Sequence, residues 1–166
     1  MKNWLLVLVF LPAFSFAQTD TSCTMDMYGC YVYAIKSLLN GSSGLAELHK
    51  SFFKKNTTVL YIPKRFYTAG LPEKIEGYKI QYIDLDAEKL KIYEAVNNKS
   101  AALFYMSELN VTASMCDLWI MPVTLEKNNN QVEANYAELG SHLLFKVCSD
   151  SGKLGYGMTI NPSEKK

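Results

Sequence analysis

His49 and His142 are the only side chains in the sequence with an ordinary pKa near neutrality, so we look first around them for acid–base or nucleophilic chemistry. A nucleophilic mechanism needs a serine, threonine or cysteine beside such a base. Ser141 precedes His142, but adjacent residues of a strand point to opposite faces of a sheet, so the two form a dyad only if Gly140 introduces a bulge. His142 is therefore a candidate base, and the competing interpretation is a surface or hydrogen-bonded histidine.

Asp117 is the acidic residue whose setting most favours a shifted pKa, because it shares one face of an apolar strand with Trp119. The competing interpretation is a water-exposed acid on an edge strand. Asp84 and Asp86 lie two residues apart at a strand–helix junction, where helix capping by Asp86 explains the pair without catalysis. Only Asp117 and His142 remain as catalytic candidates, and the sequence favours a protein that is not an enzyme without deciding the question.

Four cysteines, Cys23, Cys30, Cys116 and Cys148, predict at least one disulfide if the chain is exported. Their spacing matches no zinc-binding pattern. Residues seven apart on one helix lie about 10.5 Å from each other, beyond the ~7 Å Cα limit of a disulfide. Cys23 therefore reaches Cys30 only from a loop that folds back. We predict the pairs Cys23–Cys30 and Cys116–Cys148, and four cysteines also allow two other connectivities.

No cofactor or metal is expected. The two histidines are far apart in the sequence and the cysteines are expected to be oxidised, so no cluster of metal ligands is formed. The run 41–44 (GSSG) precedes a helix but lacks the lysine and the preceding strand of a phosphate-binding loop, and the run 155–157 (GYG) opens no helix. Arg65 is the only arginine, which argues against a nucleic-acid partner.

The first seventeen residues have the features of a secretory signal. Lys2 precedes a short apolar run, 4–14, and Ser15 and Ala17 place small residues before a cleavage site at Gln18. A membrane-spanning helix needs about 20 apolar residues, which this segment cannot supply. We predict a chain exported to the periplasm or the extracellular space, without a membrane anchor, whose residues 18–166 form one domain with balanced charge, 16 basic against 16 acidic residues.

Apolar periodicity predicts the elements that position these residues. Helices are expected over 25–39, 44–54 and, capped by Asp86, up to Val96. Strands are expected over 57–62, 78–84, 101–106, 116–125, 131–148 with a bend near Gly140, and 154–160. This order predicts an α+β fold in which N-terminal helices pack on a curved, mainly antiparallel sheet that ends in a β-meander.

The last strand, 154–160 (LGYGMTI), has large side chains on one face and glycines on the other. Glycine in a strand costs about 0.5–1 kcal/mol relative to alanine, so the pattern needs a reason. We consider curvature of the sheet the main explanation, with solvent exposure or close approach of a ligand as alternatives.

Several runs carry a resemblance: 58–62 (TVLYI), 71–84 (LPEKIEGYKIQYID), 97–106 (NNKSAALFYM) and 143–148 (LLFKVC). Over about two thirds of residues 18–166 the pattern resembles small exported proteins of Bacteroidota bacteria that carry no assigned function. Helices on a curved antiparallel sheet also resemble the cystatin/NTF2-like architecture. These resemblances imply no catalytic residues, and folds of this kind serve both binders and enzymes.

Eleven tyrosines are the main excess of the composition, and tyrosine is common at interfaces. Our leading hypothesis is therefore a non-enzymatic exported module that binds a protein or a small apolar ligand through a helix–sheet groove or a tyrosine-rich face. The alternatives are a small pocket enzyme of cystatin/NTF2-like type that uses Asp117 or His142, and a structural protein of the cell envelope.

Overall fold

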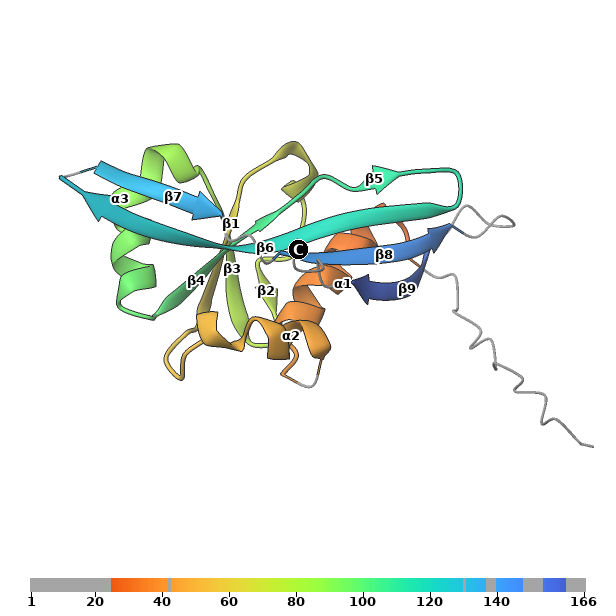
Figure 1. Cartoon of the computed structure of the whole chain (residues 1–166), viewed down its shortest axis with the longest axis horizontal. Coiled ribbons are helices and arrows are strands. Elements are labelled where there is room, and N and C mark those ends of the chain that lie inside the picture. Colours follow the sequence, from red (N-terminus) through yellow and green to blue (C-terminus); the bar gives the residue numbers. More distant parts are fainter. Residues whose placement is uncertain (1–24, 42, 130, 137–139, 148–153, 161–166) are drawn as a thin grey trace, which may run out of the picture.

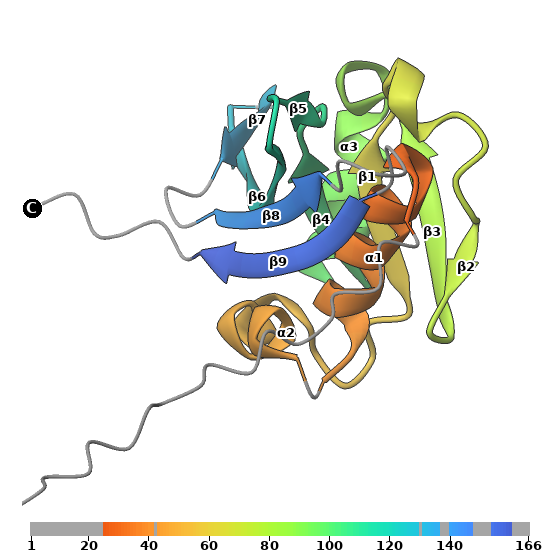
Figure 2. The ribbon, with the colours of Figure 1, turned by 90° about the vertical axis from the view of Figure 1, so that its right-hand side faces the viewer.

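A computed structural model of the chain describes residues 25–41, 43–129, 131–136, 140–147 and 154–160, and of residues 156–160 the backbone alone. Its centre is a nine-stranded mixed sheet with the strand order β2-β3-β1-β4-β6-β8-β9, in which β5 and β7 also pair with β6. Helices cover parts of both faces (Figures 1 and 2). The predicted α+β class with a mainly antiparallel sheet is confirmed.

The helices begin and end close to where the sequence predicts them. They are α1 (Met27–Leu39), α2 (Gly44–Leu48) and α3 (Leu85–Asn97), with short 3-10 turns η1 (Lys50–Phe52) and η2 (Phe66–Thr68). The predicted single helix over 44–54 is wrong in one respect, because α2 changes to η1 at His49, the residue whose side chain enters the core. Asp84, not Asp86, caps α3, since its carboxylate accepts hydrogen bonds from the amides of Asp86 and Ala87.

One half of the sheet is parallel, which the sequence did not predict. Strand β1 (Val59–Pro63) lies between β3 (Tyr78–Ile83) and β4 (Ala101–Met106) and runs parallel to both. Helix α3 connects β3 to β4. The short β2 (Lys74–Ile75) adds an antiparallel edge to β3. Strand β4 is almost fully buried on both faces, as is typical of strands in a parallel sheet.

The other half is an antiparallel arrangement around one long strand, β6 (Met115–Asn128). Besides β4, its partners are β5 (Asn110–Val111), β7 (Gln131–Tyr136) and β8 (Ser141–Val147), and β9 (Leu154–Ile160) pairs with β8. Residues 115–120 of β6 pair with β8 and residues 123–128 pair with β7, so the expected strand 131–148 is two strands. Pro122, which has no amide hydrogen to donate, lies where β6 changes partner.

The glycines of β9 coincide with an irregularity in the pairing of β9 with β8. Phe145 pairs with Tyr156 and Leu144 pairs with Met158, so Gly157 is an extra residue on β9. A bulge of this kind bends a strand and increases its twist. The register therefore supports the interpretation that Gly157 allows the sheet to curve, whereas Gly155 pairs regularly with Lys146.

The two faces of the sheet are buried by different helices. Leu60 and Ile62 of β1 belong to a large cluster with α1 and α2, whereas Tyr61, between them, belongs to a smaller cluster with Ile92 of α3. Because side chains alternate along a strand, these clusters lie on opposite faces. No helix in the described part of the chain is both long and apolar enough to cross a membrane.

Candidate functional site

The two predicted catalytic candidates lie together on the face of β6 and β8 that is turned away from α1. His142 Nε2 is 3.0 Å from Asp117 Oδ2, and the His142 ring stacks on Trp119 with a centroid separation of 4.3 Å and an interplanar angle of 16°. The cross-strand register explains the cluster, since Trp119 lies directly opposite His142 and Asp117 lies two residues before Trp119. The sequence identified Asp117 and His142 as separate candidates but did not predict that they are in contact.

A carboxylate beside an imidazole is an arrangement that orients a general base. Nε2 of His142 is nevertheless buried and makes no hydrogen bond within the described part of the chain, and its contact with Asp117 is an ion pair only if the ring carries a proton. Ser141 points to the opposite face, as the strand rule requires. The cluster therefore combines an acid, an imidazole and an indole without an adjacent serine nucleophile.

A second histidine–serine pair, which sequence reasoning missed, lies inside the core. His49 Nε2 is 3.0 Å from Ser141 Oγ, and the two residues are 2% and 0% exposed. The rings of Phe52 and Phe104 meet the imidazole edge-on. Burial lowers the pKa of His49. A base and a hydroxyl sealed from water cannot meet a substrate, so this pair is a structural hydrogen bond between the α2–η1 segment and β8.

A groove of about 500 Å³ opens between the N-terminal end of α1 and the sheet. Its walls are mostly apolar: Asp26, Met27, Tyr28, Val111, Cys116, Val147 and Leu154. Met27 and Val111 are 60% and 55% exposed, although both side chains are large and apolar. The carboxylate of Asp26 accepts the amide of Gly29 and so caps α1, which leaves that charge at the edge of the groove.

Cys116 lines this groove, and Cys30 is buried nearby on α1. Both are free thiols, so neither of the predicted disulfides, Cys23–Cys30 and Cys116–Cys148, is formed in the structure; Cys23 and Cys148 lie outside the described residues. Burial, with the charges of Cys116 and Asp26, raises the pKa of Cys30 to about 12, and burial also raises the pKa of Cys116. These thiols are therefore poor nucleophiles.

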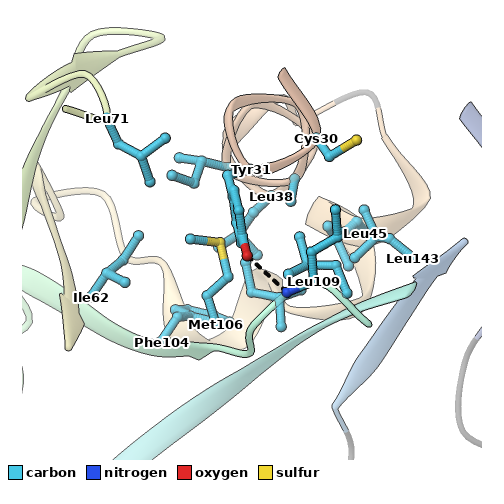
Figure 3. Close-up of a cluster of buried hydrophobic side chains, with 14 of the residues drawn as sticks. Cys30, Tyr31, Leu38, Leu45, Ile62, Leu71, Phe104, Met106, Leu109 and Leu143 are labelled. Atoms are coloured by element: carbon cyan, nitrogen blue, oxygen red, sulfur yellow. Dashed lines mark hydrogen bonds between the residues drawn. The ribbon is translucent and has the colours of Figure 1, made fainter. Parts of the chain in front are cut away.

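Tyrosines of the predicted tyrosine-rich face serve mainly to fix the backbone. The Tyr31 hydroxyl accepts the amide of Leu109 at 2.7 Å inside the core (Figure 3). Tyr67 stacks on Tyr31 with centroids 5.1 Å apart and donates to the carbonyl of Met106. Burial raises the pKa of Tyr67. These rings hold the segment after β1 and the segment after β4 against α1 and do not form a free surface.

The described residues contain no group of three or more histidine, cysteine or acidic side chains placed to hold a metal ion. No protein-family model, curated protein or solved structure matches the chain. The features of the described residues that bear on function are the groove, the Asp117–His142–Trp119 cluster and the charges of the surface.

Proposed function

We propose that this chain, after export, is a non-enzymatic interaction module that takes an apolar side chain of a protein partner into the groove beside α1. The observation that carries the proposal is an apolar hollow of about 500 Å³ bordered by strongly exposed Met27 and Val111. When a partner removes such exposed apolar groups from water, the free energy of the complex is lowered.

The character of the border favours a protein over a small ligand. Met27 and the half-exposed Tyr28 extend the apolar surface beyond the hollow itself, and methionine and tyrosine are both enriched at protein interfaces. Methionine also adapts its shape to different partners because its side chain is unbranched and flexible. A small apolar ligand would occupy the hollow and leave these outer side chains in water.

Capture from the secreted or envelope fraction of the native host, followed by affinity measurement with the purified partner, tests the proposal. Met27→Glu and Val111→Lys place charges on the border, and both positions are exposed enough to keep the fold. We expect each to weaken binding at least about tenfold, or about 1.4 kcal/mol. Leu90→Lys is the matched control, because Leu90 is 55% exposed on α3, outside the groove.

A partner that binds the Met27→Glu and Val111→Lys proteins as well as the original chain would contradict the proposal. Failure to capture any protein, with thermal stabilisation by small apolar molecules that the same two variants abolish, would instead identify the groove as a small-ligand site.

An acid–base enzyme is the second candidate, and the 3.0 Å approach of Asp117 to His142 is the observation that favours it. Neither residue lines the groove beside α1, so a substrate would have to lie on the open sheet face, against Trp119. An unchanged phenotype of Asp117→Ala and His142→Ala strains would remove this candidate.

A further inference from the structure

The parallel half of the sheet contains a topological switch point. The chain leaves β1 on the side of α1, where Tyr67 and Leu71 pack with the α1 cluster. It leaves the neighbouring strand β3 on the opposite side, through α3, whose Ile92 packs in the other cluster. In α/β sheets, adjacent strands whose connections depart to opposite faces leave a crevice at their carboxyl ends, and ligands bind in such crevices.

A cavity of about 650 Å³ lies at this place. Its floor is formed by the ends of β1 and β3, one side by the first turn of α3, and the other side by residues 132–136 of β7. The β6–β7 hairpin extends over α3, so β7 closes a crevice that the parallel strands alone would leave open (Figure 1).

Some charged side chains at the cavity have hydrogen-bond or ion-pair partners, and others form no salt bridge. One oxygen of the Asp84 carboxylate, Oδ1, accepts two amides of α3, and the carboxylate of Asp86 is paired with Lys89 at 2.9 Å. Lys64 and Arg65, directly after β1, form no salt bridge within the described residues, although both line the cavity. Two cations beside the N-terminus of a thirteen-residue helix therefore line the cavity without an ion pair of their own, although the charge of Arg65 contributes, after the hydrogen bond of Lys89, to lowering the pKa of Asp86.

We propose that this cavity is a second binding site, for a small organic molecule with one carboxylate or phosphate group that pairs with Arg65 and Lys64. Arginine binds both groups through two parallel N–H donors, and this is the only arginine of the chain. The rest of the ligand faces β7, where Glu133 and Asn135 offer hydrogen-bond acceptors. Glu133 disfavours a second negative charge at that end, so the class is restricted to molecules with a single anionic end.

The site is independent of the proposed protein interface, since the two cavities share no residue.

Titrations followed by amide NMR shifts test the proposed anion site with three probes on one carbon skeleton: glycerate, glycerol 3-phosphate and glycerol. We expect one or both anions to bind and to shift the amides of 64–65, 84–86 and 133–136, and glycerol not to bind. The comparison of the two anions separates a carboxylate site from a phosphate site.

Arg65→Gln should weaken anion binding at least tenfold and leave the melting temperature unchanged, because the side chain is exposed and makes no salt bridge within the described residues. Lys55→Gln removes an exposed cation outside the cavity and should leave affinity unchanged. The inference is overturned if neither anion binds at millimolar concentration, if glycerol binds equally well, if Arg65→Gln binds normally, or if the shifts map elsewhere.

Discussion

At the scale of single residues, His49 is a titratable group held in the core against the rings of Phe52 and Phe104. It is 2% exposed, it hydrogen-bonds Ser141, and burial lowers its pKa below the ordinary value of 6.5. In the unfolded chain the same ring takes up a proton as the pH falls below about 6.5. The native state resists that proton, so the unfolded state binds more protons over this pH range.

The free energy of unfolding should therefore decrease as the pH falls from 7.5 to 5.5, by at most about 1.4 kcal/mol per pH unit for one proton. Urea unfolding at several pH values measures this slope. The variant His49→Gln keeps a hydrogen-bonding side chain that does not titrate, and it should reduce the slope.

His142→Gln is the control for this experiment, because it removes the other histidine of the sequence and leaves the buried one in place. Its slope should still include the contribution of His49. An equal slope in the original chain and in His49→Gln would mean that the buried ring does not control the pH dependence.

Alternation along a strand correctly separated Ser141 from His142, because that rule depends only on neighbouring positions. The actual partner of Ser141 is His49, 92 positions away, and no local pattern contains that contact. The only signal in the sequence is that His49 lies within the expected helix 44–54, on or beside the face that Leu45, Leu48 and Phe52 share.

At the scale of elements, the start of α3 distinguishes two neighbouring acids. Asp84 caps the helix with hydrogen bonds of 3.1 and 3.2 Å, whereas the fully exposed Asp86 pairs with Lys89 on the surface. Asp84→Ala should lower the free energy of unfolding by about 1 kcal/mol, the usual effect of losing a cap. Asp86→Ala should cost less, since exposed ion pairs contribute little.

Thermal or urea unfolding of the two variants side by side measures the difference. A larger loss for Asp86→Ala would reverse the assignment of the cap. The hydrogen bond of Lys89 lowers the pKa of Asp86, so its small contribution should disappear in acid as the carboxylate is protonated.

The helices and long strands were predictable from apolar periodicity. Their order along the chain, however, was not sufficient to predict which strands pair. The stripe of α1 that includes Cys30, Ala34 and Leu38 is buried as its spacing indicates. The two-residue strands β2 and β5 are too short to carry a pattern. The parallel pairing of β1 with β3 and β4 depends on contacts between distant segments, and only the continuous apolar character of β4 hinted at it.

At the scale of the whole molecule, the proposed export of the protein predicts that its first seventeen residues are removed. Expression in a secreting host should yield a protein that begins at Gln18, because Ser15 and Ala17 fit the small-residue positions of a signal-peptidase site. Intact mass and N-terminal sequencing measure the processed end. Ala17→Tyr should block processing, and Phe16→Tyr, between the two small residues, should not. Retention of residues 1–17 in the mature protein would contradict the proposal.

Strand β6 has a further consequence for how this sequence can change. It takes part in four ladders, and two of them divide its length, since residues 115–120 pair with β8 and residues 123–128 pair with β7. Inserting or deleting one residue beside Pro122 would leave one ladder in frame and turn every side chain of the other toward the wrong side of the sheet. Evolution can therefore replace residues in this strand one at a time but cannot readily alter its length, and the same holds for anyone who redesigns it.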